Sequence, residues 1–562
     1  MQLFNFISGL SALACLNLVN AVPVQEEFSH LSKRCDFDSA TAPDCWGDYS
    51  LSTNWYDEAP NTGVVREYWL ELTNSTAAPD GVDRMVLSVN GSVPGPTIFA
   101  DWGDTVVVHV HNGLENNGTS IHWHGIRQNY TNEADGVASI TQCPAAPGET
   151  ITYRWRATQY GTTWYHSHFA LQAQNGVVGG VVINGPATAP YDEDKGIVFL
   201  TDWFHQTSDS LYAQASSSGP PTPPNGLING TNTYEDGGSR LTTTFEAGKR
   251  YRLRLVNGAM DNHFKFSIDN HTLTVIASDL VPIVPYQTET VALGIGQRYD
   301  VIVEANQTPG NYWMRSIPQL TCGSNGNTLD IKGIINYDTV ELADPTTSMW
   351  QYTDDCNDES LSNLVPYVAI DAEVASVEEV MDVGLSTVEG FFKWTINSNT
   401  FLSDWAEPTL QKVFNPDATY RADENIVTLN ETNEWVYLVI ESQLGLPHPI
   451  HLHGHDFLIL GQQAMATYEN SSSLNLVNPP RRDVAMLPAS GYLAIGFKSD
   501  NPGVWLAHCH IGWHTSQGLA LQLIERASEI ASTVNQDDLD NTCQAWTTYA
   551  TANAIVQDDS GV

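Results

Sequence analysis

The sequence predicts an all-β protein made of several Greek-key sandwiches or barrels. Short alternating runs recur along the chain, among them Thr105 to Val110 and Tyr251 to Val256, and turns rich in glycine and proline separate them. At 562 residues the chain is long enough for three domains of ordinary size. We therefore expect consecutive β-domains rather than a mixed α/β fold.

The N-terminus predicts export. An apolar run from Leu3 to Val19 ends in small residues at Ala21, which is typical of a secretory signal peptide even though no Lys or Arg precedes it. The dibasic pair Lys33-Arg34 then indicates a cleavable propeptide. We expect a signal peptide over 1–21, a propeptide over 22–34 and a soluble, secreted product.

The charge balance limits the partners of the chain. It carries 65 acidic and 24 basic residues, a formal net charge of −41 and a pI near 4.4. Such a surface repels phosphate backbones and anionic membranes. No later run is long and apolar enough to span a bilayer. We expect neither nucleic acid nor a membrane as a partner.

One heptapeptide near the C-terminus is unusually rich in side chains that bind metal ions. His508-Cys509-His510-Ile511-Gly512-Trp513-His514 places one thiol and three imidazoles within seven residues. On a strand, Cys509 faces one way while His508 and His510 face the other, so one segment serves two metal sites. A thiolate with imidazoles selects copper in a trigonal site, in which His514 joins Cys509.

Three more histidine clusters accompany this segment. They are His122-Trp123-His124, His166-Ser167-His168 and the run from His448 through His451 to His453, so that ten of the 17 histidines fall in four clusters. A single His-x-His pair is often only the polar face of a strand. Four clusters around one cysteine, without a Cys-x-x-C pair of the kind common in structural zinc sites, indicate copper instead.

The motifs HWHG, HSH, HPIHLHGHDF and HCHIGWH, in this order, resemble those of the multicopper oxidases, and within that family the secreted laccases of ascomycete fungi. The resemblance covers nearly the whole mature chain. The terminal residues Asp559 to Val562 are similar to the DSGL tail that plugs the solvent tunnel in these relatives, with Val562 in place of leucine. The resemblance implies four copper ions, one-electron oxidation of small phenols and aromatic amines, and reduction of dioxygen to water.

The resemblance also implies a role for each ligand. The type 1 copper takes His448, Cys509 and His514, and the type 2 copper takes His122 and His451. The type 3 pair takes His124, His166, His168, His453, His508 and His510. Leu519, ten residues after Cys509, occupies the axial position of the type 1 site and cannot coordinate copper, which should raise the reduction potential.

Three carboxylates are candidates for work beside the metals. Asp135 matches a position near the trinuclear site, where it either relays protons for dioxygen reduction or orients a histidine; Asp456 is a candidate for similar support. In the family, the middle domain forms one wall of a substrate pocket whose floor is the histidine corresponding to His448. The residue of that wall that accepts the phenol proton is expected to be Asp236, with Glu235 as the alternative.

The resemblance implies three cupredoxin-like domains, over residues 60–190, 191–345 and 395–540. An acidic connection over 346–394 separates the last two, and a tail over 541–562 ends the chain. Because the ligands come from the first and last thirds, the trinuclear cluster is expected at the interface of these two domains.

Cysteines and sequons agree with export. Outside Cys15 and Cys509 six cysteines remain, enough for three disulfides, and their pairing is open from the sequence alone. The resemblance implies Cys35 to Cys45, Cys143 to Cys543 and Cys322 to Cys356. Sequons for N-linked glycans occur at Asn74, Asn90, Asn117, Asn129, Asn229, Asn270, Asn306, Asn430 and Asn470. We expect a glycosylated monomer.

Two other functions compete with the laccase interpretation. A ferroxidase or a bilirubin oxidase is the alternative within the family, but fungal ferroxidases usually carry a membrane tether, and Leu519 differs from the axial methionine of bilirubin oxidases. A copper-binding secreted glycoprotein without turnover is the alternative outside it. The complete set of ten histidines and Cys509 argues against that last interpretation.

Overall fold

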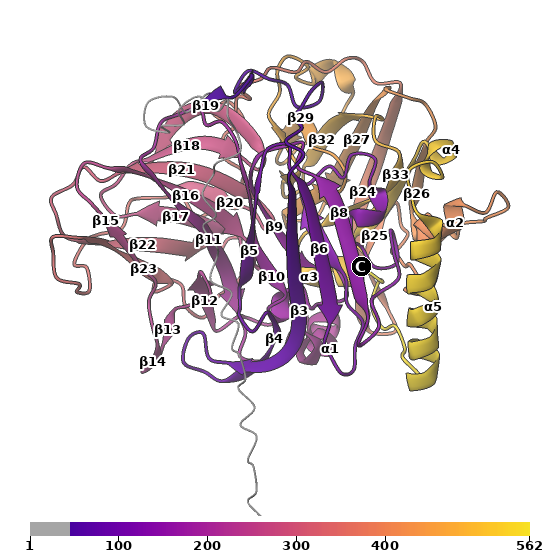
Figure 1. Cartoon of the computed structure of the whole chain (residues 1–562), viewed down its shortest axis with the longest axis horizontal. Helices are drawn as coiled ribbons and strands as arrows, with labels where there is room; N and C mark the ends of the chain where they lie inside the picture. Colours follow the sequence, from indigo (N-terminus) through magenta and orange to yellow (C-terminus); the bar gives the residue numbers. More distant parts are fainter. Residues whose placement is uncertain (1–44) are drawn as a thin grey trace, which may run out of the picture.

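The computed structural model describes residues 45–562. The predicted signal peptide, the propeptide and the Cys35 to Cys45 disulfide lie outside the described residues. Figure 1 shows three bodies of strands side by side, coloured from indigo through pink to orange along the chain. Each body is built on two large sheets, and the first and middle bodies each add a two-stranded sheet, so the all-β prediction is confirmed.

The first body packs two four-stranded sheets, ordered β4-β3-β6-β8 and β5-β10-β9-β7. Leu70, Val108 and Trp155 of one sheet meet Ile98 and Trp123 of the other in one buried core. Its elements are β1 (Cys45–Trp46), β2 (Tyr49–Ser50), β3 (Val65–Ala77), β4 (Arg84–Val89), β5 (Gly95–Asp101), β6 (Thr105–Asn112), β7 (Ile121–His124), η1 (Asn132–Ala134), β8 (Thr150–Arg156), β9 (Gly161–Ser167), η2 (Ala173–Asn175) and β10 (Val178–Asn184).

The middle body packs a six-stranded sheet, β12-β11-β16-β21-β18-β19, on a five-stranded one, β15-β23-β22-β17-β20. Leu253, Val275 and Val301 of the first sheet share a core with Phe266 and Met314 of the second. Its elements are β11 (Glu193–Trp203), α1 (Ser208–Ser218), β12 (Asn225–Ile228), β13 (Thr233–Tyr234), β14 (Gly237–Gly238), β15 (Thr242–Phe245), β16 (Arg250–Asn257), β17 (Phe264–Ile268), β18 (Leu273–Ser278), β19 (Val281–Thr288), β20 (Val291–Leu293), β21 (Arg298–Glu304), β22 (Asn311–Pro318) and β23 (Lys332–Tyr337).

The third body packs β25-β24-β27-β32-β29-β30 on β26-β34-β33-β28-β31. Its elements are β24 (Val377–Val388), β25 (Phe391–Ile396), α2 (Thr409–Val413), η3 (Ala422–Glu424), β26 (Ile426–Leu429), β27 (Trp435–Ser442), β28 (His448–Leu452), β29 (Phe457–Gln463), η4 (Ser471–Ser473), β30 (Arg481–Arg482), β31 (Val484–Leu487), β32 (Tyr492–Lys498), β33 (Gly503–Cys509), α3 (Gly512–Ser516) and β34 (Ala520–Glu525).

The stretch 346–394, predicted as a connection, contains β24 and the start of β25. These strands pair with each other, and β24 also pairs with β27, so they belong to the third body. Exposed acidic residues such as Glu378, Glu379 and Asp382 interrupt the alternation of β24, which explains why the sequence reads as irregular there. The connection without strands therefore spans 338–376.

The C-terminal segment closes the first body onto the third. Helices α4 (Ala527–Ile530) and α5 (Gln536–Asn553) follow β34, and α5 runs along the outer edge in Figure 1. A disulfide joins Cys543 of α5 to Cys143, and a second joins Cys322 to Cys356, so both of these predicted bridges are confirmed. The chain then turns back inward, and Val562 ends buried.

Candidate metal centre

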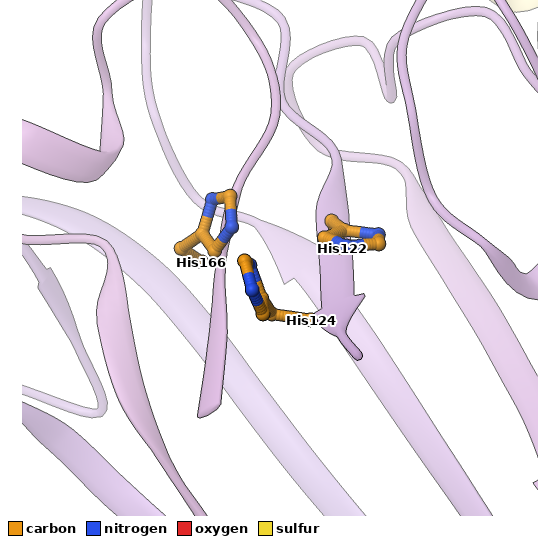
Figure 2. A group of neighbouring side chains, drawn as sticks. All are labelled: His122, His124 and His166. Atoms are coloured by element: carbon orange, nitrogen blue, oxygen red, sulfur yellow. The ribbon is translucent and has the colours of Figure 1, made fainter. Parts of the chain in front are cut away.

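Strand pairing in the first body gathers four histidines. β7 runs antiparallel to β9 with His122 opposite His166, and His124 lies on the same face of β7 as His122. Figure 2 shows these three rings drawn together from the two strands. The ring centres of His122 and His166 lie 5.4 Å apart, and those of His124 and His166 lie 5.7 Å apart. His168 joins them with its ring centre 5.7 Å from that of His122.

Strand pairing in the third body gathers four more. β28 runs antiparallel to β33 with His451 opposite His508 and Ile450 opposite Cys509. His453, just beyond β28, brings its Nε2 within 3.2 Å of Nε2 of His508. His510 completes the group, with its ring centre 5.4 Å from that of His508.

The two groups meet at the interface of the first and third bodies. The rings of His124 and His451 stack with centres 3.9 Å apart, and those of His122 and His453 lie 4.0 Å apart. The structure therefore brings the eight histidines predicted for the trinuclear site into one buried cluster: His122, His124, His166, His168, His451, His453, His508 and His510.

The chemical state of this cluster fits metal ions. Burial, reinforced by the neighbouring imidazoles, lowers the pKa of His124, His166 and His451 well below the usual range, and burial lowers that of His508 to about 4. These rings are neutral and carry a free lone pair. Among the described residues, the buried Nε2 atoms of His122, His166 and His451 have no hydrogen-bond partner. Converging neutral imidazoles whose inner nitrogens are unpaired are the donor set that copper ions require.

The outer nitrogens of the rings are held by oxygen acceptors. The Nδ1–H of His453 donates to Asp135 Oδ2 over 2.9 Å, and that of His122 donates to the Asp135 carbonyl over 2.8 Å. His451 Nδ1–H donates to the carbonyl of Asp483 over 2.8 Å. These bonds fix the tautomer and leave Nε2 for a metal. Asp135 thus lies at the cluster, as the sequence predicts.

Asp456 does not lie where the sequence places it. Its carboxylate accepts hydrogen bonds from the Tyr56 hydroxyl and pairs with Arg481 Nε at 3.1 Å and Arg127 Nε at 4.0 Å. It therefore ties the N-terminal segment to the third body. Its position near His453 in sequence does not bring it to the rings, because the chain turns at Gly454 with φ +71°.

The second predicted site lies on the opposite face of β33. Cys509 Sγ is 3.7 Å from His448 Nδ1 and 3.6 Å from His514 Nδ1, and the two nitrogens are 3.2 Å apart. Burial raises the pKa of the Cys509 thiol far above its usual range. A thiolate at this place therefore needs a bound cation, as a soft metal site provides.

Leu519 packs beside this site. It is buried in the same core cluster as Cys509, its carbonyl accepts the Cys509 N–H over 3.1 Å, and its own N–H donates to the His514 carbonyl over 3.0 Å. Its side chain offers no donor atom, so among the side chains named here the sulfur and the two imidazoles alone can bind a metal.

Both histidines of this site are buried, and His514, rather than the His448 that the sequence analysis expects, lies nearer to solvent. His448 is 0% exposed, whereas His514 retains 7%. The indole of Trp394 on β25 lies 4.2 Å from the His514 ring, centre to centre, and forms an aromatic wall beside it. The physical reason is topological: His448 begins an inner strand, whereas His514 lies on the short helix α3 after β33 has ended.

Asp236, predicted to accept the proton of the substrate, lies in an exposed turn. Asp236 and Glu235 are exposed in the tight turn between β13 and β14, which packs against Gly81 of the first body and lies at the lower edge in Figure 1. The acidic sequence of this turn suggested a substrate-binding loop. Its two strands have only two residues each, however, and the turn lies at the edge of the molecule.

Asp261 is a carboxylate in a loop that contacts the segment carrying the second site. It lies in the loop between β16 and β17, where the carbonyl of Met260 accepts the N–H of Gly512 over 3.1 Å. Burial, together with the charge of Asp202, raises the pKa of Asp261 to about 7, and its charge in turn acts on Cys509. An acidic residue inside a loop between two buried strands was the available sequence signal.

Asp202 holds this loop in place. Its Oδ1 accepts the N–H of Met260 over 2.8 Å, and its Oδ2 accepts those of Asp261 and Asn262 over 2.8 and 3.1 Å. These three hydrogen bonds to successive N–H groups fix the backbone conformation of the loop at Asp261.

The C-terminal residues reach the histidine cluster. Val562 lines a cavity together with His166, His168, His508 and His510. Ser139 Oγ and Trp405 Nε1 donate to the carbonyl of Gly561 over 2.9 and 3.1 Å, which anchors the last residues between the first and third bodies.

Comparisons with known proteins agree with this geometry. Three family models described as multicopper oxidase match residues 71–188, 194–339 and 395–529. Laccase-2 of Botryotinia fuckeliana is 51% identical over 543 residues, which cover 93% of each chain, and the laccase of Cryphonectria parasitica is 44% identical over 92% of this chain and 93% of its own.

Solved structures give the same result. The laccase from Botrytis aclada superimposes with a TM-score of 0.90 at 50% identity, covering 94% of this chain and all of that chain. Fet3p, described as a multicopper oxidase that functions in iron import, gives a TM-score of 0.78 at 28% identity, over 86% of this chain and 95% of its own. The predicted fold of three cupredoxin-type domains is confirmed.

Proposed function

The chain belongs to the multicopper oxidase family, and on that basis we infer that it acts as a laccase, which oxidises small aromatic donors by one electron and reduces dioxygen to water. The observation that carries this inference is that neighbouring residues at the C-terminal end of β33 face two different sites. Cys509 faces the two-histidine site, while its neighbours His508 and His510 face the cluster of eight imidazoles.

We assign four copper ions to these two sites. Type 1 copper is held by His448, Cys509 and His514, and type 2 copper by His122 and His451. The type 3 pair is held by His124, His166, His168, His453, His508 and His510. When bound, these ions take up single electrons at the thiolate site and supply four electrons to dioxygen at the cluster.

The protein supplies the path between the sites. The peptide from Cys509 to His508 and to His510 is covalent, and its backbone is fixed by the pairing of β33 with β28 and β34. Cys509 is fully buried in an apolar core, which shields the thiolate from solvent. Leu519, buried in the same core, would leave a bound copper with hydrocarbon and no thioether donor at that place, and we expect a reduction potential above that of relatives with a methionine there.

We propose that the donor binds near His514, with Trp394 and Asp261 as the residues that act on it. The Trp394 indole beside His514 offers an apolar face to an aromatic ring. Asp261, with its pKa at about 7, accepts the phenolic proton as the electron leaves toward His514. A donor without an acidic hydroxyl needs no such acceptor. The pocket is therefore suited to small phenols and aromatic amines.

Protons for water formation pass through Asp135. Its carboxylate bonds His453 and lies 3.3 Å from His122, so it is next to the place where dioxygen is reduced. A buried carboxylate in contact with two ligand histidines can both orient them and hand on a proton.

The surroundings of the protein follow from the same proposal. The predicted signal peptide and the two disulfides support secretion, and the sequons support N-linked glycans. Among residues 45–562, no helix combines the length and the apolar character needed to cross a bilayer.

Oxygen uptake by the copper-loaded protein with a methoxyphenol tests the function. We expect one dioxygen consumed per four phenols and no peroxide released. No uptake with phenols, together with rapid uptake on Fe(II) or bilirubin, would replace the laccase assignment with one of the other oxidases in the family.

A further inference from the structure

The middle domain contributes no copper ligand to the assignment above, yet one of its loops touches the histidine cluster. The loop 294–297 joins β20 to β21 and carries Gly296 at φ +86°. A Cβ atom on Gly296 would lie 3.0 Å from Cδ2 of His510 and 3.2 Å from Cε1 of His124. The backbone of the middle domain therefore packs directly on two rings of the trinuclear site.

The next residue but one, Arg298, reaches further. Its guanidinium is fully buried and donates through Nη1 and Nη2 to the two carboxylate oxygens of Asp483 over 2.5 and 2.6 Å. Asp483 belongs to the third domain and follows β30. One bidentate pair thus joins the middle domain to the third directly behind the cluster.

Asp483 is in turn the acceptor for two cluster histidines. Its Oδ1 accepts the Nε2–H of His124 over 3.1 Å, and its carbonyl accepts the Nδ1–H of His451 over 2.8 Å. With Nε2 of His124 engaged, its Nδ1 is the atom that faces the cluster, 3.3 Å from Nε2 of His510. The position of Asp483 decides which nitrogen His124 offers to a metal.

A second carboxylate, Asp279, comes from the middle domain and completes the arrangement. Asp279 Oδ1 accepts the N–H of Arg298 over 2.9 Å, and its Oδ2 accepts the N–H of Asp483 and Nε of Arg482 over 3.1 Å each. The four side chains, two arginines and two aspartates, balance in charge and are all buried. Such a network keeps its geometry because removal of one member leaves an uncompensated charge.

We propose that the middle domain helps to position the ligands of the trinuclear copper site. In this proposal Arg298 is a positioning residue that holds Asp483 as a hydrogen-bond acceptor for His124 and His451. This rests on the proposed function only in requiring copper at the cluster. Without Arg298, the carboxylate of Asp483 is free to turn and to compete as a ligand, since its oxygen lies within 4.8 Å of the donor atoms of His124 and His451.

Arg298→Met, made in the full chain and loaded with copper, tests this proposal. We expect the blue absorption of thiolate-bound copper to remain, the copper content per chain to fall because the cluster fills incompletely, and oxygen uptake to drop about 10- to 100-fold. The retained blue absorption shows in the same sample that the third domain is folded.

Arg315→Met is the matched control. Arg315 makes the same buried, bidentate pair in the same domain, with Nε and Nη2 donating to the carboxylate of Asp269 over 2.7 Å each. No cluster histidine lies behind Asp269, so this variant should keep its full copper content. Equal loss of cluster copper in both variants, or full copper and full oxygen uptake in Arg298→Met, would overturn the proposal.

Gly296→Ala provides a test that leaves all four charges in place, should Arg298→Met fail to fold. The added Cβ presses on His124 and His510, so cluster copper should again fall while the blue absorption stays. An unchanged copper content of the cluster in Gly296→Ala would contradict the proposed contact between the middle domain and the cluster. Failure of the unmodified protein to bind copper at the cluster would instead count against the proposed function.

Discussion

Two strands of the first domain carry the same His-x-His spacing with opposite outcomes. On β7, His122 and His124 are 1% and 0% exposed and face histidines from another domain. On β6, His109 and His111 face solvent. His109 hydrogen-bonds Thr152 Oγ1 and Glu67 Oε1, both at 2.8 Å, and His111 hydrogen-bonds Thr150 Oγ1 at 3.0 Å.

The difference lies in what faces each strand. The neighbours of β6 are β3 and β8, whose outward residues are hydroxyls, carboxylates and the indole of Trp69, and these occupy ring nitrogens of His109 and His111. The neighbour of β7 is β9, which supplies His166, and beyond it lies the third domain. Spacing selects one face of a strand, and the partner of that face decides whether a metal site forms.

The largest expected effect is the contrast between His124→Ala and His111→Ala. Loss of His124 removes a cluster ligand, so cluster copper should be lost and oxygen uptake should fall by more than about 100-fold, above the usual cost of losing a supporting residue. His111→Ala should stay within about twofold of the unmodified protein, as expected for a surface substitution. Copper per chain and oxygen uptake measure both. A similar loss in the two variants would break the comparison.

A similar contrast, between a half-buried and an exposed group, applies to two carboxylates. Asp261→Asn should lower phenol oxidation about 10²- to 10⁴-fold because the proton acceptor is gone, and it should spare a donor without a hydroxyl group. Asp236→Asn, in the exposed turn, should change neither rate. The ratio of the two rates in each variant is the measurement, and a larger effect at Asp236 would restore the sequence-based assignment.

The pH dependence of that ratio follows from the pKa of Asp261, about 7. Below this pH the carboxyl is protonated and cannot accept a proton, so the ratio of phenol to non-phenol oxidation should rise as the pH increases through about 7. In Asp261→Asn this rise should disappear.

A smaller change is expected from Asp202→Asn. Removing the negative charge of Asp202 lowers the pKa of Asp261, so the midpoint of the rate ratio should move to lower pH. Asp202→Glu keeps the charge and should keep the midpoint near that of the unmodified protein. A midpoint that does not move in Asp202→Asn would show that burial alone sets the acidity of Asp261.

The smallest effect is expected on the exposed histidine strand. Trp69 is 64% exposed and stacks on His109 with ring centres 4.0 Å apart. Trp69→Ala should lower the free energy of unfolding by about 0.5–1.5 kcal/mol and leave the copper content unchanged. Chemical denaturation with copper analysis checks both, and loss of copper would show that the outer face of β6 is coupled to the cluster.

Sequence reasoning selected the ten histidines and Cys509 because metal ligands recur at spacings that a strand presents on one face. It overlooked the pair on β6, which has the same spacing. It also missed Asp261, Asp483 and Arg298, whose roles depend on contacts between distant segments: His124 and Asp483 are 359 residues apart in sequence. No local pattern encodes such a contact.

The choice between His448 and His514 shows the same limit. Both belong to recognisable motifs, and the motif says nothing about which of the two buried rings lies nearer to solvent. That is decided by where β33 ends and α3 begins. The strand character of β24 was hidden for a related reason, because its acidic side chains point to solvent while its backbone completes a sheet.

The bond between Cys143 and Cys543 spans 400 residues, and His124 meets His510 across 386. During synthesis the chain emerges from its N-terminus and domains generally fold in that order. For nearly all of translation, the four cluster histidines of the first domain therefore lack their partners from the third domain. The site can therefore close only at the end of synthesis, when an oxidant for the cysteines and copper for the imidazoles must both be present.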